Sequence, residues 1–217
     1  MECRFCNGIC IKKGKRKGVQ RYRCKDCGRY QQKEYTKAII PVEKYILVQR
    51  LNNEGCGISS ISRLLGISKS SVQRLIERIA LQLKMPELSE TGQSYEIDEV
   101  RTYCGNKKNE CWIIYAINKA SGTVVDFCVG RRTKENLKKI TDSVLKLKPQ
   151  KVYTDKLNIY SSLIPKAIHK VFEYCINKIE RKNLSLRTHL KRMSRKTICF
   201  NKSTSMLENC VKIYMVV

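Results

Sequence analysis

Three acidic residues, Asp98, Asp155 and Glu180, stand where they could hold a metal ion. Asp98 lies within the alternating segment 94–103, Asp155 ends the short segment 151–155, and Glu180 is isolated among cationic residues. Carboxylates are hard oxygen ligands of the kind that Mg²⁺ prefers. Two such ions about 3.5–4 Å apart can activate a nucleophile and stabilise the leaving oxygen of a phosphodiester. The three acids are therefore candidates for metal-dependent cleavage of nucleic acid.

Each of these acids could instead be an ordinary solvated or salt-bridged residue. Glu99 is also a direct competitor of Asp98, because neighbours on a strand point to opposite faces. The alternating pattern alone does not choose between the two. Glu180 has a stronger case, since cations around it could hold DNA while the acid holds metal.

Four cysteines near the N-terminus form a second set of candidate ligands. Cys3, Cys6, Cys24 and Cys27 make two Cys-x-x-Cys pairs with 17 residues between them, a zinc-ribbon spacing. Zinc takes four such ligands at tetrahedral corners about 2.3 Å away. Four thiolates leave no open position, so we expect a structural zinc that replaces a missing apolar core. Redox chemistry or unrelated free thiols are the alternatives.

The chain that must position these residues divides into three predicted domains: a zinc ribbon over 1–36, a helix-turn-helix over 41–85 and a catalytic domain over 93–217. In the second, apolar residues recur at helical spacing up to Gly66, where a left-handed turn residue would end a helix. Ser68 can cap the next helix.

This second helix would present polar and basic side chains to a DNA major groove. They are Lys69, Ser70, Gln73, Arg74 and Arg78. An ordinary helical hairpin with a solvated face is the alternative.

The third domain alternates strand-like and helix-like periodicity. We expect strands over 94–103, 111–117, 123–129, 151–155 and 167–172, and helices over 133–147, 157–163 and 177 to about 195. This order predicts an α/β fold, a ribonuclease-H-like mixed sheet with flanking helices. In that fold the fourth strand neighbours the first, which would bring Asp155 towards Asp98, while Glu180 begins the last helix.

The charge of the chain indicates an anionic partner. Its 217 residues carry 44 Lys and Arg against 19 Asp and Glu, a formal net charge of +25. Residues 1–40 hold twelve cations and three acids, and residues 178–202 hold nine cations and one acid. Two separate basic segments favour nucleic acid over a generic soluble surface. No apolar run reaches the roughly 18 residues that cross a bilayer, so we expect a cytoplasmic, nucleoid-associated protein without a membrane partner.

Several segments resemble the transposases of the insertion sequence one family. They are DEVRTY from residue 98, YTD from 153, IERKNLSLRTHLKR from 179 and RKTICFNKS from 195. The paired cysteines, QRYRC over 20–24 and the helix-turn-helix extend the resemblance to the N-terminal half. It therefore covers most of the chain, in order.

The resemblance implies a DDE transposase whose acids are Asp98, Asp155 and Glu180, with Mg²⁺ or Mn²⁺ as the catalytic metal. It selects Asp98 over Glu99, and the 24 residues between Asp155 and Glu180 match the family's short spacing. The aromatic residue that the family has after its second Asp would be Tyr160. Basic residues of the last helix are predicted to contact DNA: Arg181, Arg187, Lys191 and Arg192.

Such an enzyme binds the terminal inverted repeats of an insertion sequence, cleaves the element ends and joins them to target DNA. Because it handles two ends, we expect self-association in the active complex. Two alternatives are a non-catalytic DNA-binding regulator, which would give residues 93–217 no role, and a metal-dependent nuclease without a joining step.

Overall fold

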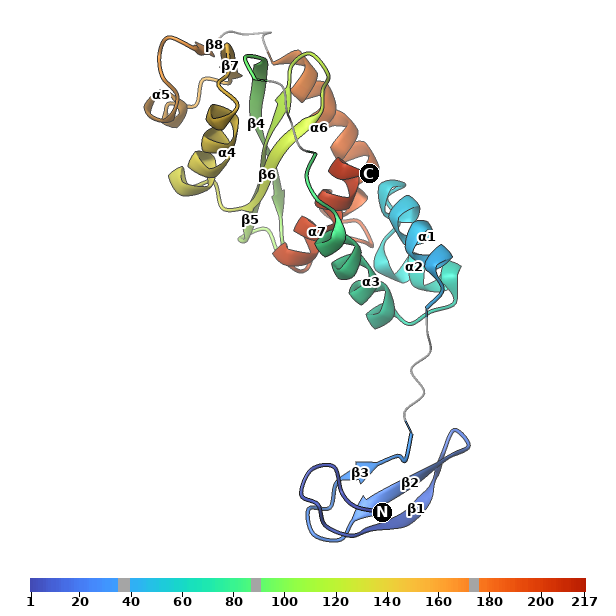
Figure 1. Ribbon diagram of the computed structural model, residues 1–217. Helices are drawn as coiled ribbons and strands as arrows, with labels where there is room; N and C mark the ends of the chain where they lie inside the picture. The colour runs from blue at the N-terminus through green and yellow to red at the C-terminus, as the bar shows by residue number, and fades with distance from the viewer. Residues whose placement is uncertain (35–39, 87–90, 172–175) are drawn as a thin grey trace. The chain divides into compact units, whose positions relative to one another are not determined.

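The structure is a computed structural model that describes residues 1–34, 40–86, 91–171 and 176–217 (Figure 1). The chain divides into two compact units, Met1–Pro41 and Val42–Val217.

The first unit is a small antiparallel sheet in the order β1-β2-β3. Its strands are β1 (Cys10–Arg16), β2 (Val19–Cys24) and β3 (Tyr30–Gln31). The apolar residues buried here are three cysteines, Cys3, Cys10 and Cys24, with Tyr22 packed against them. So few buried groups supply little hydrophobic stabilisation, which supports a metal as the centre of this unit.

The second unit begins with the predicted helix-turn-helix. Its helices are α1 (Val42–Asn53), α2 (Ile58–Leu65) and α3 (Lys69–Gln82). Gly66 adopts the left-handed conformation (φ 62°) and ends α2, while the Ser68 hydroxyl accepts a hydrogen bond from the Ser71 N–H at 3.1 Å. Both turn features predicted from the sequence are confirmed.

The second unit continues as a five-stranded mixed sheet in the order β6-β5-β4-β7-β8. The strands are β4 (Ser94–Tyr103), β5 (Glu110–Asn118), β6 (Val124–Gly130), β7 (Lys151–Thr154) and β8 (His169–Val171). β4, β5 and β6 pair antiparallel, whereas β7 pairs parallel to both β4 and β8. This order confirms the ribonuclease-H-like fold, in which the fourth strand lies beside the first.

Helices cover both faces of this sheet (Figure 1). They are α4 (Lys134–Lys146), α5 (Ile159–Leu163), α6 (Asn177–His189) and α7 (Thr204–Val216). Helices α4 and α5 share a core with Tyr95 and Ile97, and α6 and α7 share the other with Val100 and Tyr115. Alternation along β4 therefore directs Asp98 towards α6 and Glu99 towards α5.

The last predicted helix is shorter than expected. It ends at His189 rather than near residue 195, and a 3₁₀ turn covers Lys191–Met193. Leu190 leaves the helical conformation (φ −84°, ψ 76°), and the Thr102 hydroxyl donates to the Met193 carbonyl at 2.8 Å. This break lets Leu190 and Met193 both enter the core.

Helix α7 was not predicted, although its signals are present in the sequence. The Ser203 hydroxyl caps its start by accepting from the Met206 N–H. Leu207, Cys210 and Val211 then recur at helical spacing and are buried.

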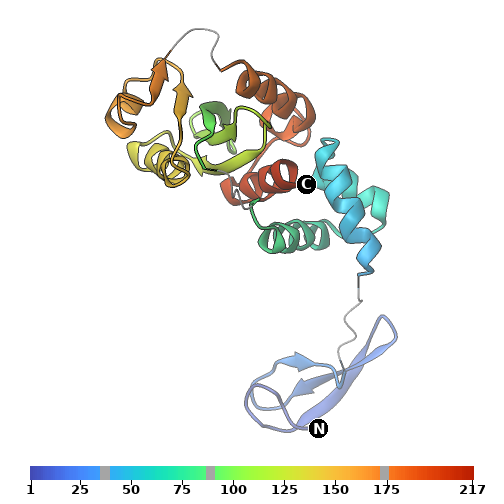
Figure 2. The same cartoon turned by 45° about the horizontal axis from the view of Figure 1, so that its top comes forward.

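The helix-turn-helix packs directly on the part of the unit that holds the five-stranded sheet, and Figure 2 shows α7 beside α3. The Asn52 side-chain amide donates to the Cys210 carbonyl at 3.1 Å. A Cβ at Gly55 would lie 2.2 Å from the His189 carbonyl oxygen, and a Cβ at Gly57 would lie 2.5 Å from Cys199 Cβ. Glycine at both positions therefore permits the close approach of the α1–α2 turn to residues 189–199.

Candidate active site and zinc centre

An acidic cluster lies where β7 ends beside β4. The parallel register pairs Glu96 with Tyr153, so that the chain beyond β7 runs alongside Asp98. One carboxylate oxygen each from Asp98, Glu99 and Asp155 lies within 4.8 Å of the others. The structure thus brings together two of the three predicted acids, Asp98 and Asp155, and also Glu99, the alternative to Asp98.

Asp98 is fixed on the α6 side of the sheet. The Asn183 side-chain amide donates to Asp98 Oδ2 at 2.6 Å, and the Tyr115 hydroxyl donates to the other atom of that amide, Oδ1, at 2.6 Å. Burial, together with the charges of Asp155 and Glu180, raises the pKa of Asp98 to about 6, although the hydrogen bonds from the Glu99 N–H and the Asn183 amide act to lower it.

Glu99 is fixed on the opposite side by different partners. The buried Tyr160 hydroxyl donates to Glu99 Oε1, and Arg132 Nη1 lies 3.9 Å from Glu99 Oε2. Burial raises the pKa of Glu99 to about 7, with contributions from Asp155 and Asp98. Tyr160, which the resemblance predicts to be the family's aromatic residue, therefore holds Glu99 through its hydroxyl.

Asp155 and Glu180 are the more accessible members. Asp155 is half-buried, and its Oδ1 accepts from the Leu157 N–H at 3.0 Å. Glu180 is exposed in the first turn of α6 and stands outside the group whose oxygens lie within 4.8 Å. It precedes Asn183 by three residues, which places it on the same face of α6 as the Asp98 partner.

Glu96 is a supporting residue that the sequence analysis did not select. It is fully buried two residues before Asp98, and its carboxylate accepts from the Ile179 N–H at 2.8 Å. Lys119 Nζ pairs with the same carboxylate at 2.7 Å. Glu96 therefore ties the first turn of α6, which carries Glu180, to strand β4.

We expect Glu96→Ala to destabilise the second unit by about 2–4 kcal/mol, because it leaves the Ile179 N–H and the Lys119 ammonium without their carboxylate. Urea unfolding monitored by circular dichroism measures this loss. The matched control is Glu208→Ala, at an exposed position in the middle of α7, which should change the unfolding free energy by less than about 0.5 kcal/mol. Equal unfolding midpoints for both variants would contradict the role of Glu96.

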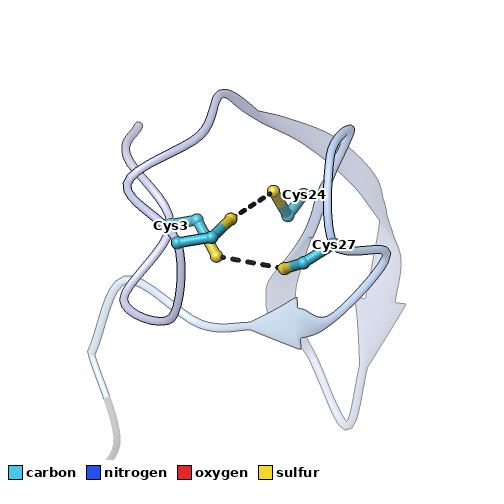
Figure 3. Close-up of side chains that lie close together, drawn as sticks. Cys3, Cys24 and Cys27 are labelled. Carbon is cyan, nitrogen blue, oxygen red and sulfur yellow. Dashed lines mark hydrogen bonds between the residues drawn. The ribbon is translucent and has the colours of Figure 1, made fainter.

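The four predicted zinc ligands converge in the first unit. The sulfurs of Cys3, Cys6, Cys24 and Cys27 lie within 4.8 Å of one another. Cys3 Sγ is 3.6 Å from Cys27 Sγ, and Cys6 Sγ is 3.5 Å from Cys24 Sγ. Figure 3 shows Cys3, Cys24 and Cys27 pointing towards one another. These separations approach the edge of about 3.8 Å for a tetrahedron with zinc–sulfur bonds of about 2.3 Å.

Backbone N–H groups favour the thiolate form that zinc binds. The Phe5 N–H lies 3.5 Å from Cys3 Sγ and lowers the pKa of that thiol to about 6. The Cys27 N–H likewise lowers the pKa of Cys24. The donor set and its local hydrogen bonds therefore fit a four-thiolate zinc site.

The predicted DNA-contacting residues differ in their exposure. Those on α3 are all exposed: Lys69, Ser70, Gln73, Arg74 and Arg78. Arg181, Arg187 and Lys191 are exposed as well, whereas Arg192 is buried with 4% of its surface accessible. His189, near the end of α6, contacts the Tyr214 hydroxyl of α7 through Nδ1 at 2.8 Å.

None of the helices within the described parts of the chain is both long enough and apolar enough to span a bilayer.

Solved structures that are similar to this chain include two retroviral proteins of low sequence identity. A simian T-cell lymphotropic virus intasome in complex with the PP2A regulatory subunit B56 gamma matches with a TM-score of 0.40 and 16% identity, covering 75% of this chain and 66% of that chain. The HTLV-2 integrase catalytic core domain in complex with magnesium (trimeric form) matches with a TM-score of 0.40 and 14% identity, covering 59% and 86%. The fold assignment rests on the strand order described above.

Sequence comparisons are more specific. The iso-IS1n protein InsB of Shigella dysenteriae is 32% identical over 120 residues, covering 55% of this chain and 92% of the relative. The IS1 4 protein InsB of Escherichia coli K12 is 31% identical over 120 residues, covering 55% and 72%. The IS1 transposase family profile matches residues 93–217, the part of the chain that contains the whole acidic cluster. This chain belongs to the IS1 transposase family.

Proposed function

We propose that the chain is a DDE transposase that cleaves the ends of an insertion sequence and joins them to target DNA. The observation that carries this proposal is the meeting of Asp98 and Asp155 where β7 ends beside β4, the central strand of a ribonuclease-H-like sheet. Glu180 completes the proposed trio from the first turn of α6, where its charge already acts on Asp98.

The cluster is suited to divalent metal. Its donors are hard carboxylate oxygens, and burial together with mutual repulsion raises the pKa of Asp98 and Glu99. A divalent cation relieves this repulsion, and Mg²⁺ or Mn²⁺ matches the donor type. When bound, such ions supply activation of the attacking oxygen and stabilisation of the leaving oxygen of a phosphodiester.

The two adjacent acids of β4 receive different proposed roles. Asp98 faces α6, and the hydrogen bonds that its oxygens accept within the described parts of the chain come from the Asn183 amide and the Glu99 N–H. Glu99 faces α5, where the Tyr160 hydroxyl and the Arg132 guanidinium occupy its carboxylate. We assign Asp98 to the metal, because its side faces Glu180, and Glu99 to orientation of Arg132 at the edge of the site.

The remaining parts of the chain recognise DNA in this proposal. The exposed basic face of α3 enters the major groove of the terminal inverted repeat. The first unit adds the exposed cations of its β1–β2 hairpin, which lies between the two cysteine pairs, and the exposed cations of α6 contact the strand being processed. Self-association brings the two element ends together, and the protein works where its DNA is, at the nucleoid.

Strand joining separates this function from its alternatives. The full chain, loaded with zinc, is mixed with Mg²⁺, a target plasmid and a duplex of the flanking element end that is already cut at its 3′ terminus. We expect covalent joining of that 3′-hydroxyl to the plasmid. Cleavage of uncut ends without joining would identify a nuclease, and DNA binding without either reaction would identify a regulator.

The raised pKa of Asp98 also predicts a pH-dependent effect on stability. The folded chain holds this proton up to a pH of about 6, whereas an unfolded aspartate releases it near 4. The free energy of unfolding of the metal-free protein therefore falls as the pH rises from about 4 to about 6, and it stays reduced at higher pH. Asp98→Asn should raise the melting temperature of the metal-free protein at pH 7.5 and leave it nearly unchanged at pH 4.

Differential scanning calorimetry in chelator measures this effect, which we expect to be on the order of 2 kcal/mol at pH 7.5. Added Mn²⁺ should raise the melting temperature of the parent at pH 7.5 but not that of Asp98→Asn. A lower melting temperature for metal-free Asp98→Asn at pH 7.5 would show that this carboxylate is a stabilising structural group.

A further inference from the structure

A basic pocket lies within the second unit, between the helix-turn-helix and the segment that follows α6. It has a volume of about 530 Å³ and is lined by residues of α2, of α3 and of the segment 192–206. Four cations line it: Arg63, Lys69, Arg192 and Lys202. No acidic residue is among the described residues that line it, so the pocket carries an uncompensated positive charge.

Two buried side chains in this pocket have polar atoms without a hydrogen-bond partner among the described residues. Arg192 is 4% exposed, and its Nη2 makes no hydrogen bond to any described part of the chain. Asn201 is 3% exposed, and neither Oδ1 nor Nδ2 has a partner among the described residues. Buried polar groups are nearly always paired, and a buried cation without a counter-charge is strongly unfavourable. Both residues therefore indicate a ligand that is anionic and accepts hydrogen bonds.

The pocket is built rigidly around these groups. The Asn201 N–H donates to the Arg192 carbonyl at 3.2 Å, which fixes the two residues to each other. Because Gly57 has no Cβ, the start of α2 can approach Cys199 closely. Helix α2 has no side-chain cap at Gly57, so its N-terminal N–H groups add positive potential near the pocket.

The chemistry of the lining selects a phosphate. Two guanidinium groups, two ammonium groups and two side-chain amides match the oxygens of a phosphodiester, and Arg is well suited to such planar recognition. The pocket also contains Lys69 and Gln73 of α3, the helix proposed to read the major groove. A duplex seated on α3 would therefore present a backbone phosphate to this pocket.

A second basic pocket lies beside the first, since Lys202 lines both. It has a volume of about 800 Å³, shares Lys202 with the first pocket and contains Arg131 and Arg132. Its lining acid, Glu110, is paired with Arg101. Arg132 in turn lies 3.9 Å from Glu99 of the acidic cluster. The two pockets therefore connect α3 with the acidic cluster through cationic side chains.

We propose that these pockets form a phosphate-binding track, in which Arg192 and Asn201 hold a backbone phosphate of the duplex read by α3. Lys202 and Arg132 then hold the strand as it runs towards the acids. The inference rests on the proposed function and adds to it the residues that couple DNA recognition to the reaction centre.

The test measures binding of the zinc-loaded full chain to a 30-base-pair duplex of mixed sequence by fluorescence anisotropy, over a series of NaCl concentrations. Each lost phosphate contact should lower the slope of log K against log salt by about 1. We expect Lys202→Ala and Arg192→Met each to lower this slope and to weaken binding about 5- to 20-fold at 100 mM salt. Lys146→Ala, an exposed cation on α4, is the matched control and should stay within about twofold.

Thermal stability distinguishes a ligand-binding arginine from a structural one. Because Arg192 is an unpaired buried charge in the free protein, Arg192→Met should melt at or above the temperature of the parent. Inorganic phosphate should raise the melting temperature of the parent but not that of Arg192→Met. Folded Lys202→Ala and Arg192→Met proteins with the salt slope of the parent would overturn the proposal.

The remaining outcomes also decide for or against the phosphate-binding track. Stabilisation by inorganic phosphate with an unchanged DNA slope would identify a free-anion site and overturn the assignment to DNA. If Arg192→Met does not fold, Lys202→Ala decides by the same criterion. Strand joining is measured separately, so a chain that fails to join ends but keeps the salt effect would refute the proposed function and leave the phosphate pocket standing.

Discussion

Replacing Asp155 by Asn should abolish cleavage and joining of element ends, with a loss of about a thousandfold or more. Asp155 supplies an oxygen to the acidic cluster at the end of β7. An amide at this position keeps the shape of the side chain but removes the charge that holds a divalent ion, whose contribution to phosphodiester chemistry is several kcal/mol. Gel assays of strand cleavage and strand transfer with the flanking element end measure the loss.

DNA binding should survive the same change. Asp155 is not one of the residues predicted to contact DNA, so the affinity of Asp155→Asn for the element end should stay within about twofold of the parent. Asp142→Asn, an exposed acid on α4, is the matched control and should retain full activity. Cleavage by Asp155→Asn at the rate of the parent would remove Asp155 from the reaction centre.

The second large effect is the loss of zinc. Removing one of four thiolates by Cys24→Ser should unfold the first unit, because this unit has little apolar core other than three cysteines and Tyr22. Apparent binding energies of structural zinc are about 10–16 kcal/mol, far more than such a core could supply. Elemental analysis should find about one zinc per parent chain and little zinc in the variant.

Cys10→Ser is the control for this prediction. Cys10 is buried in the same small unit but stands outside the four-sulfur cluster. We expect this variant to retain zinc and the NMR spectrum of a folded first unit. Zinc loss in both variants alike would point to a general requirement for buried thiols, and a folded, zinc-free Cys24→Ser protein would refute the metal centre.

Much of the second unit was predictable because its local signals agree with its tertiary packing. Strand β4 matches the predicted range 94–103, and Thr133 caps α4 as its position implied. Gly66 and Ser68 mark the turn before α3 for a similar reason, since a left-handed residue and a capping hydroxyl are local requirements.

The end of α6 was not predictable from periodicity. Leu190 and Met193 continue the apolar spacing of a helix, but the chain turns between them because Thr102 binds the Met193 carbonyl. A contact between residues 91 positions apart leaves no mark on local sequence. Arg192 was consequently predicted on a helix surface, whereas the turn buries it.

The acidic cluster shows the same division between local and long-range information. Alternation predicted that Asp98 and Glu99 point to opposite faces, and the cores on either side of β4 agree. Both carboxylates still lie close to Asp155, because β7 ends at Thr154. Beyond that residue, β7 no longer separates the two faces of the sheet beside β4. Their partners Asn183, Tyr160 and Arg132 come from three different segments, which only the fold brings together.

The most direct test of the central claim is strand transfer by Asp155→Cys in Mg²⁺ and in Mn²⁺. A thiolate is a softer ligand than a carboxylate, and the hard Mg²⁺ ion accepts it less readily than Mn²⁺ does. If Asp155 binds the catalytic metal, the variant should be inactive with Mg²⁺ and regain at least about tenfold activity with Mn²⁺. An Mn²⁺ to Mg²⁺ activity ratio equal to that of Asp142→Cys would contradict the assignment of Asp155 as a metal ligand.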